Sequence, residues 1–505
     1  MKKNLTMYIT TLTLLAALTV PVQLAAQDNA SPNHKAKHHH YQLFDMGTLG
    51  GPNSFPPNQG ILDINSRGLA IAEAETLIPD PYFPNCLQPP DCLVNHAITW
   101  QNGVQTDLGS LPGLNNSFPF WSNSQGTVVG ISENSLIDPL TGYPEIIAVQ
   151  WKHGKIFDLG TLGGNVSLAG AVNNQGQVAG LALNTIPDSY ATPLVPVPFP
   201  LATQSRAVLW QGGIIQDLGT LGSGNDAAAF FVNNRGQVAG VSYTNTTPNS
   251  TTGIPTFDPF FWENGKMVDI GTLGGTIGYP NWMNNRGQVA GVSYTAGDQA
   301  YHAFLWDQHQ NPPLTDLGTL GGIYSSANWI NDAGEVVGWA TTPSDQTSQA
   351  FLWKNGVMTD LGTVDSDLCS QAYSINSQGQ IVGGSYIDCG QDTHGFLSEN
   401  GGPMVDLQTL IPPGSRVTVL YATDINDRGE IVASGVLSNG DGRSVVLIPC
   451  DEQHHGVEGC DYSLVDAAAA AKSPAPRHVP SGTQRLPQWR RSNRYHFPGL
   501  QPPSK

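Results

Sequence analysis

The sequence predicts an all-β protein, and three observations carry that prediction. Glycine and proline together supply 94 of the 505 residues, more than a helical chain tolerates. Only 12% of the residues are charged, whereas helices need Glu and Lys in bulk. Short runs rich in Val, Ile, Phe and Trp alternate with Gly- and Asn-containing turns along most of the chain, and this alternation is typical of strands.

Residues 1–26 are predicted to be a secretory signal peptide. Lys2 and Lys3 form a basic start, residues 7–20 are apolar, and residues 24–26 offer a small-residue cleavage site before Gln27. An uncleaved anchor helix is the alternative, but Pro21 and the short apolar run argue against a full span. No second long apolar run follows, so we expect a secreted extracellular or periplasmic protein that does not span the membrane after cleavage.

Two segments flank the central region. Residues 27–40, which include His34, His38, His39 and His40, are predicted to be flexible, and any metal bound there would be adventitious. Residues 451–505 form a C-terminal extension that we expect to be disordered from about residue 467, where an alanine run passes into Pro- and Arg-rich sequence.

The central region, residues 41–450, is built from repeats. The phrase Asp-Leu-Gly-Thr-Leu-Gly-Gly recurs with small changes at intervals of 44 to 62 residues. Its copies start at Asp45, Asp107, Asp158, Asp217, Asp269, Asp316, Asp360 and Asp406. Between copies stand an Asn-x-x-Gly-x-Val phrase and an apolar phrase that ends in Trp. Self-similarity at this period indicates a repeat architecture.

Each repeat predicts four strands. The Asn-x-x-Gly and Asn-Gly sequences, such as Asn355-Gly356, have the chemistry of tight hairpin turns. Strand A ends at the Asn, strand B holds the Val-rich run, strand C ends at the Trp, and strand D ends at Asp-Leu-Gly. Four antiparallel strands per repeat of this length are the size of a propeller blade.

The strand count predicts eight blades. Eight A, B and C strands can be identified, but D strands number eight only when residues 41–47 at the start are included. The last group, about 418–449, has no D strand of its own. Pairing the first strand with the last three closes a ring without exposed edges. A linear β-solenoid is the alternative, but it does not explain complementary partial units at the two ends.

These motifs resemble a known family. The His302-Ala303-Phe304 phrase, together with the repeated Asp-Leu-Gly and Asn-x-x-Gly phrases, is similar to the HAF family of extracellular repeats in bacteria. The resemblance covers roughly residues 41–450 and implies an exported bacterial protein. It implies no catalytic or binding residues, and His-Ala-Phe is intact in one repeat only.

Cysteine usage agrees with export. The six cysteines form three close pairs, Cys86/Cys92, Cys369/Cys389 and Cys450/Cys460. Fifteen connectivities are possible, and proximity favours this one. Metal ligation is the alternative, but no C-x-x-C pair is present. We therefore predict three disulfides.

The sequence contains no recognised catalytic, metal or cofactor motif, so we assign no cofactor. The eight repeated Asp residues are expected to be structural, bonding backbone N–H groups where strand D ends. Asp63 and Asp424 occupy equivalent positions in the first and last repeats, which ring closure would place in adjacent blades. They are weak candidates for an acid–base pair of a glycosidase.

A binding surface is the preferred hypothesis. All the length variation falls in the B–C connections, whereas the A–B and C–D turns are short, so the face with the B–C and D–A loops is elaborated on a rigid scaffold. Six aromatic residues near that face are tentative ligand-binding candidates, with packing between blades as the alternative reading: Trp121, Phe231, Trp282, Trp329, Tyr279 and Tyr324.

Three functions remain open. The first is an exported, non-catalytic, monomeric propeller that binds a glycan or a surface protein. The second is an exported polysaccharide hydrolase or lyase with acidic residues at the channel mouth, and the third is a structural envelope component. Residues 41–460 hold 11 Lys and Arg against 37 Asp and Glu, a net charge of −26, which excludes nucleic acid as a partner of this region.

Overall fold

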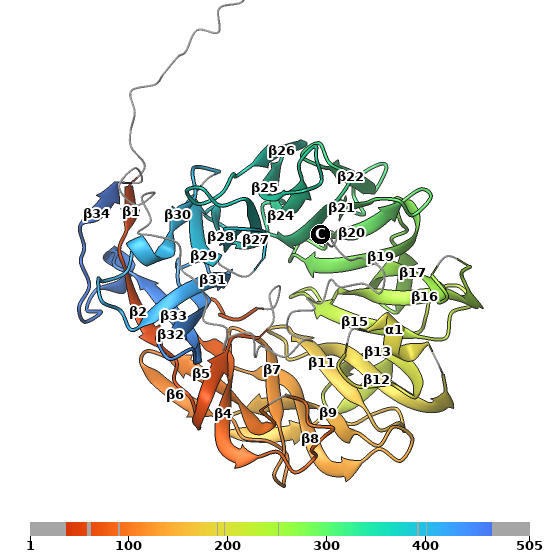
Figure 1. The fold of residues 1–505 in the computed structure, drawn as a ribbon. Helices are drawn as coiled ribbons and strands as arrows, with labels where there is room; N and C mark the ends of the chain where they lie inside the picture. The colour runs from red at the N-terminus through yellow and green to blue at the C-terminus, as the bar shows by residue number, and fades with distance from the viewer. Residues whose placement is uncertain are drawn as a thin grey trace, which may run out of the picture. The chain divides into compact units, whose positions relative to one another are not determined.

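The computed structural model describes residues 37–57, 62–88, 91–188, 190–195, 197–250, 252–390, 393–399 and 401–466. The predicted signal peptide, most of the segment 27–40 and the tail from residue 467 lie outside the described residues. The described part is almost entirely β, as predicted, and its strands form eight four-stranded sheets arranged as a ring of blades (Figure 1).

The first four blades take their strands in chain order, A to D. Their bounds are as follows: blade 1, β3 (Gly50–Phe55), β4 (Ala70–Pro79), β5 (Leu93–Gln101) and β6 (Val104–Asp107); blade 2, β7 (Ser117–Ser122), β8 (Val128–Ile137), β9 (Pro144–Lys152) and β10 (Lys155–Asp158); blade 3, β11 (Ser167–Val172), β12 (Val178–Pro187), β13 (Thr203–Gln211) and β14 (Ile214–Asp217); blade 4, β15 (Ala227–Val232), β16 (Val238–Pro248), β17 (Pro255–Glu263) and β18 (Lys266–Asp269). Helix α1 (Ala191–Leu194) lies in the B–C connection of blade 3.

Three further blades follow the same order, and the eighth is composite. Their bounds are: blade 5, β19 (Gly274–Met283), β20 (Val289–Thr295), β21 (Tyr301–Trp306) and β22 (Leu314–Gly318); blade 6, β23 (Ser325–Ile330), β24 (Val336–Thr341), β25 (Ser348–Lys354) and β26 (Val357–Asp360); blade 7, β27 (Cys369–Ile375), β28 (Gln380–Tyr386), β29 (Thr393–Glu399) and β30 (Val405–Asp406), with the 3-10 helix η1 (Leu407–Thr409); blade 8, β31 (Val417–Ile425), β32 (Ile431–Leu437), β33 (Gly442–Pro449) and β2 (Tyr41–Asp45). Neighbouring strands within every blade are antiparallel.

The ring closes as predicted from the partial units at the two ends. Strand β2 pairs antiparallel with β33, and the register runs from Tyr41 opposite Pro449 to Asp45 opposite Val445. An N-terminal strand therefore supplies the outer strand of the last blade, which leaves neither half of that blade as an isolated partial sheet.

The asparagine that ends each A strand links the blades in a second way. Its Oδ1 accepts hydrogen bonds from the backbone N–H groups two and four residues on, as at Asn123, where the donors are Gln125 and Thr127. Its Nδ2 donates to the backbone carbonyl of the equivalent asparagine in the next blade. The eight asparagines form a complete circle of such bonds: Asn65, Asn123, Asn173, Asn233, Asn284, Asn331, Asn376 and Asn426, whose Nδ2 donates to Asn65 O at 3.0 Å.

The repeated Asp residues are structural, as expected. In every copy Oδ1 accepts a hydrogen bond from the backbone N–H two residues on, at 2.7 to 2.9 Å. The structure adds a contact that the sequence reasoning missed. In two blades a histidine of strand C pairs with this Asp, His96 with Asp107 and His302 with Asp316. The His of the His-Ala-Phe phrase is thus a partner of the Asp-Leu-Gly phrase of its own blade.

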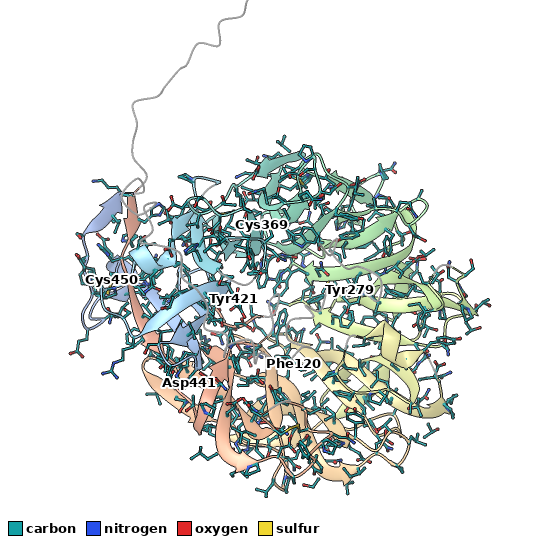
Figure 2. All side chains as sticks on the ribbon, viewed as in Figure 1. Phe120, Tyr279, Cys369, Tyr421, Asp441 and Cys450 are labelled. Atoms are coloured by element: carbon teal, nitrogen blue, oxygen red, sulfur yellow. A yellow bond between two sulfur atoms is a disulfide. The ribbon has the colours of Figure 1, made fainter. Side chains whose placement is uncertain are left out.

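Apolar side chains of strands B and C fill the space within and between blades. Five of the six strand-C tryptophans are buried: Trp100, Trp151, Trp210, Trp262 and Trp306. The A strands line the centre of the ring, where Figure 2 shows Phe120, Tyr279 and Tyr421 around the middle. The core is therefore distributed among the blades, and its innermost layer is aromatic.

The ends of the described region differ from prediction in one respect. Residues 37–40 belong to the segment predicted to be flexible, but β1 (Lys37–His39) pairs with β34 (Leu464–Asp466) of the C-terminal extension. His38 is buried and lies 2.7 Å from Glu399. The 3-10 helix η2 (Glu452–His454) also orders the start of the extension. Pairing with a second segment supplies the backbone partners that this short strand could not find alone.

The three predicted disulfides are confirmed: Cys86–Cys92, Cys369–Cys389 and Cys450–Cys460. The first stabilises the long B–C connection of blade 1, and the last joins β33 to the extension. Among the described residues, no helix is long and apolar enough to cross a membrane.

Candidate functional site

The propeller has two unlike faces. We call the side with the D–A and B–C connections the loop face, and the side with the A–B and C–D turns the turn face. The C–D turns have the expected tight geometry: Asn264-Gly265 and Asn355-Gly356 take φ values of 52° and 82°, and 53° and 82°, as a two-residue hairpin turn requires. The loop face is longer in sequence. Contrary to prediction, four of the six aromatic candidates do not lie near it, because each is the last residue but one of an A strand and is therefore next to an A–B turn: Trp121, Phe231, Trp282 and Trp329.

Four of the six candidate aromatic residues meet around the centre of the ring, whereas Tyr279 stacks on Phe230 and Tyr324 packs against Tyr301. Trp282 stacks on Trp329, with ring centroids 3.3 Å apart, and on Trp121 at 4.9 Å. Trp121 belongs to blade 2 and Trp282 to blade 5, so these rings meet across the channel. Phe231 packs against both of them.

This packing leaves little aromatic surface for a ligand. Phe231, Tyr279, Trp282 and Trp329 are each no more than 6% exposed, whereas Trp121 and Tyr324 are half-buried. A ligand that stacked on these four buried rings would have to displace the side chains that pack against them. Their ligand-binding role stays a prediction, and their observed role is to fill the channel.

Asp63 and Asp424 lie in adjacent blades, as ring closure predicts, but both side chains are completely buried. The Asp424 carboxylate accepts hydrogen bonds from the backbone N–H groups of Asp63 and Ile64, at 3.0 and 3.2 Å. It also accepts one from the Ser374 hydroxyl at 2.8 Å. Burial raises the pKa of Asp424 to about 7. Asp424 therefore joins blades 7, 8 and 1, and the pair does not open onto the channel mouth.

Buried carboxyl groups recur beneath the loop face. Burial raises the pKa values of Glu75, Glu133 and Asp226 to about 7. Each accepts hydrogen bonds from a backbone N–H of a neighbouring segment: Glu75 from Asn53, Glu133 from Asn116 and Asp226 from Ser205. Through these hydrogen bonds, the buried carboxyl groups hold the neighbouring backbone segments of the loop face in place. In the described ranges, no three His, Cys, Asp or Glu side chains are grouped so as to hold a metal ion.

The B–C connections of blades 1, 2 and 3 share a side-chain hydrogen bond between an aspartate and an asparagine, which we call the latch. Asp80, Asp138 and Asp188 stand at equivalent places in them, and each accepts a hydrogen bond from the side chain of an asparagine in the D–A loop of the next blade. The donors are Asn116 at 2.6 Å, Asn165 at 2.9 Å and Asn225, respectively. Each latch ties one blade's long connection to its neighbour, so the loop face is ordered here.

Aliphatic side chains directly before these latches project from the protein. Ile78, Leu136 and Ile186, each two residues before its latch aspartate, are 43%, 57% and 53% exposed, and Leu77 beside Ile78 is also exposed. Phe83 and Leu140, further along the same connections, are also exposed. Exposed apolar side chains at equivalent positions in three consecutive blades mark this part of the loop face as a contact surface.

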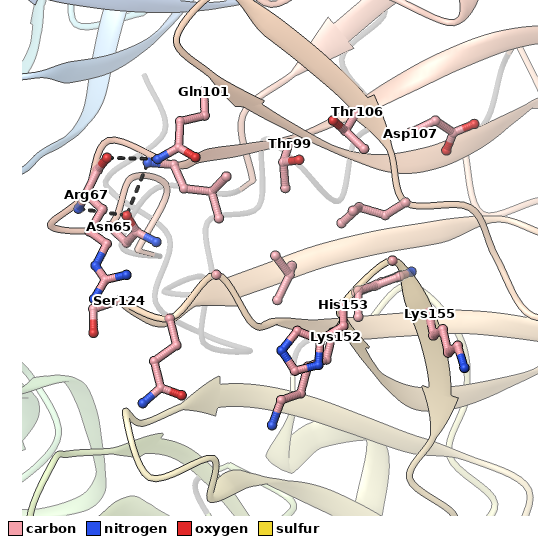
Figure 3. Close-up of a pocket in the computed structure, with 17 residues that line it drawn as sticks. Asn65, Arg67, Thr99, Gln101, Thr106, Asp107, Ser124, Lys152, His153 and Lys155 are labelled. Atoms are coloured by element: carbon pink, nitrogen blue, oxygen red, sulfur yellow. Dashed lines mark hydrogen bonds between the residues drawn. The ribbon is translucent and has the colours of Figure 1, made fainter.

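A pocket of about 410 Å³ lies on the turn face, between blades 1 and 2. Its walls are the A–B turns of both blades and the C–D turn of blade 2 (Figure 3). Arg67 and Gln101 stand on one side, and Lys152, His153 and Lys155 on the other. The indole of Trp151 contributes to the lining and donates to the backbone carbonyl of Gly109.

Sequence reasoning overlooked this pocket because it looked for length variation, and the turn face has almost none. A signal was nevertheless present. The residue four positions after the conserved asparagine is Gln or Glu in six repeats, but it is Leu69 in blade 1 and Thr127 in blade 2. Aligning the repeats at this position identifies the two blades that enclose the pocket.

Comparisons with known proteins give similarity at the level of the fold. No family model and no curated protein matches the chain. Among solved structures, the β-propeller domain of the Trilobed protease from Pyrococcus furiosus is similar over 69% of this chain and 98% of that one, with 9% identity and a TM-score of 0.40. A prolyl endopeptidase covers 63% of this chain and 46% of its own, with 11% identity and a TM-score of 0.42. A putative gluconolactonase covers 82% and 98%, with 9% identity and a TM-score of 0.30.

Proposed function

We propose that this chain is an exported, non-catalytic binding propeller related to the HAF repeats, and that its loop face binds a protein at the cell surface or in the extracellular space. The observation that carries the proposal is the set of exposed aliphatic side chains at equivalent positions in blades 1 to 3, Ile78, Leu136 and Ile186. Apolar side chains held on ordered loops lose little conformational entropy on binding. The three disulfides support export.

A protein ligand fits this surface better than a glycan does. Sugar rings stack on exposed aromatic faces, and four of the six candidate rings are buried. Aliphatic side chains surrounded by polar groups, in contrast, are typical of protein interfaces. The hydrolase alternative has less support, because the carboxyl groups of Asp63 and Asp424 are both buried.

The test compares two matched triple variants of the full chain. The first is Ile78→Ser/Leu136→Ser/Ile186→Ser on the loop face. The control is Val104→Ser/Ile214→Ser/Val357→Ser, which changes aliphatic residues that are more exposed and lie at equivalent C–D turns on the turn face. Saturation binding of the labelled protein to intact cells of the encoding organism is measured for both variants and for the unmodified chain.

We expect the loop-face variant to bind about tenfold more weakly, as substitutions at the centre of an interface do, and the control to bind like the unmodified chain. Equal binding of both variants would contradict the proposal. Treating the cells with protease separates the ligand classes, because binding that survives it would indicate a glycan. Self-association of the chain that only the loop-face variant loses would instead indicate a homodimer.

A further inference from the structure

Positive charge is concentrated on the turn face. Eight of the 11 Lys and Arg residues of region 41–460 lie in A–B turns or at the strand ends that flank C–D turns: Arg67, Arg235, Arg286, Arg428, Lys152, Lys155, Lys266 and Lys354. Three of these eight line the pocket between blades 1 and 2. In a region with a net charge of −26, that grouping produces a local positive site in an acidic surrounding.

The pocket exists because two blades lack a side chain that the other six have. In blades 3 to 8, the Gln or Glu four residues after the conserved asparagine reaches a residue at or beyond the end of its own strand C. Examples are Gln237, which donates to Glu263 at 2.8 Å, and Gln380, which donates to Glu399 at 2.8 Å. Leu69 and Thr127 cannot make this contact, so space remains between the A–B and C–D turns of blades 1 and 2.

The same absence leaves Lys152 without the carboxylate partner that the equivalent lysine of blade 6 has. Lys354 occupies the equivalent position in blade 6, and its ammonium group lies 2.6 Å from the Glu335 carboxylate. In blade 2 the residue corresponding to Glu335 is Thr127, which carries no charge. Among the described residues, no carboxylate lies within ion-pair distance of Lys152, Lys155 or Arg67.

The one acidic residue of the lining is already engaged. Asp107 lies at the far end of the pocket, where Figure 3 shows its carboxylate away from Lys152 and Lys155. Both of its oxygens are 3.1 Å from His96 Nδ1, and Oδ1 also accepts from the Gly109 N–H. These contacts lower the pKa of Asp107 against the opposing effect of burial. Its charge is therefore directed to His96 and not to the lysines.

The neutral groups of the pocket are suited to hydroxyl groups. Thr99 and Thr106 contribute hydroxyls, and Gln101 and Gln125 contribute amides. The amide nitrogens donate to backbone carbonyls, Gln101 to Arg67 and Gln125 to Asn174, which leaves each amide oxygen as an acceptor.

The backbone on the Arg67 side is fixed before any ligand binds. The Arg67 N–H donates to Asn65 Oδ1 at 2.9 Å. The Arg67 carbonyl accepts from Gln101 and, at 3.4 Å, from Arg428 of blade 8. A wall held by these contacts needs no rearrangement on binding, which favours affinity.

We infer that the pocket between blades 1 and 2 binds a sugar that carries an anionic group. Arg67, Lys152, His153 and Lys155 receive the anionic group, and the hydroxyls and amide oxygens of the lining bind the ring hydroxyls, beside the edge of Trp151. The volume of about 410 Å³ falls in the range of small-molecule sites. This site is on the opposite face from the proposed protein-binding surface and is independent of it.

The test uses isothermal titration calorimetry on the full chain with four probes. Two are anionic sugars, digalacturonate and glucose 6-phosphate, which distinguish a carboxylate source from a phosphate source. The others are the neutral disaccharide cellobiose and inorganic phosphate. We expect at least one anionic sugar to bind more tightly than both of the others, and its affinity to fall with salt.

Three variants localise the binding. Thr127→Glu should reproduce the Glu335–Lys354 arrangement of blade 6 and neutralise Lys152 within an intact fold. Both Thr127→Glu and Lys152→Gln should weaken binding about tenfold, the value of one charge-assisted hydrogen bond. The control is Lys266→Gln, the equivalent of Lys155 in blade 4, and it should leave the affinity unchanged.

The inference is overturned if neither anionic sugar binds, or if cellobiose or inorganic phosphate binds as tightly as both anionic sugars. It is also overturned if Lys152→Gln and Lys266→Gln have the same effect. Thermal unfolding of each variant shows whether weaker binding merely reflects a damaged fold.

Discussion

The two faces of the propeller are built from the same eight repeats, but they obtain their character by opposite routes. On the loop face, insertions in the B–C connections add buried carboxyl groups, Asp–Asn latches and exposed aliphatic residues. On the turn face, no insertion is needed. Two substitutions in a repeated contact, Leu69 and Thr127, open a pocket and leave a lysine unpaired. A repeat protein can therefore acquire a site by adding sequence or by omitting one side chain.

The largest effect is expected where both faces depend on the same element, the asparagine circle. Asn426→Ala removes the donor to the Asn65 carbonyl, the contact to Glu430 and the acceptor for two backbone N–H groups. Because these groups are buried, we expect a loss of about 3 kcal/mol in the free energy of unfolding. Urea denaturation measures it. Asn439→Ala, at an exposed hairpin tip, should change stability little, and equal effects would show that the circle does not stabilise the ring.

The next effect concerns the acids beneath the loop face. Burial raises the pKa values of Glu75, Glu133 and Asp226 to about 7, and it does the same for Asp424 at the opposite end of an A strand. A group with a raised pKa binds its proton more tightly in the folded state, so stability falls as pH rises from the ordinary carboxyl pKa towards 7. The raised pKa of His454 acts in the same direction above its ordinary value.

Urea denaturation at about pH 5.5 and at about pH 8.5 should therefore give a lower midpoint at the higher pH. The lowered pKa values of Asp316, Glu335 and Glu399 predict a second loss of stability in acid, below about pH 4. A midpoint that rises steadily from pH 5.5 to 8.5 would contradict the role given to the buried acids.

A single residue can reduce this pH dependence. In blade 4, Asp258 takes the place that His96 and His302 hold in blades 1 and 5, and it faces Asp269 of its own blade. Burial and the neighbouring Asp269 charge raise the pKa of Asp258. We expect Asp258→Asn to stabilise the protein by about 1 kcal/mol at alkaline pH and to have no such effect near pH 5, where the carboxyl is protonated. The same gain at both values would show that repulsion is not the cause.

The smallest effect belongs to the turn face. His153 takes a φ of 52° in a turn where blades 1, 4 and 6 have Asn102, Asn264 and Asn355 at nearly the same φ. Asn adopts this left-handed conformation more readily, so His153→Asn should stabilise the protein by about 0.5 kcal/mol. The same variant should weaken binding of an anionic sugar. If the variant is more stable but binds the sugar more weakly, His153 contributes to binding at a cost in stability.

Much of the fold could be read from the sequence because repetition makes local chemistry visible. The Asp-Leu-Gly and Asn-x-x-Gly phrases specify turns within a few residues, and the unpaired strand at each end predicted the β2–β33 closure. The site was less accessible. The candidate aromatic residues stand at equivalent positions in separate blades, but the sequence does not show that Trp121 and Trp282 stack on each other across the channel.

The sequence by itself determined the all-β class, the eight blades, the ring closure and the three disulfides, since each depends on local turn chemistry, on counting or on short separations. Only the tertiary structure showed which side chains contact one another when they are 44 or more residues apart in the sequence. It turned the capping asparagines into a circle of bonds between blades, buried Asp63 and Asp424, and placed Arg67 opposite Lys152 and Lys155. The physical reason is that a side chain has several donors or acceptors, and the sequence identifies its nearby partner but not the one that the next blade supplies.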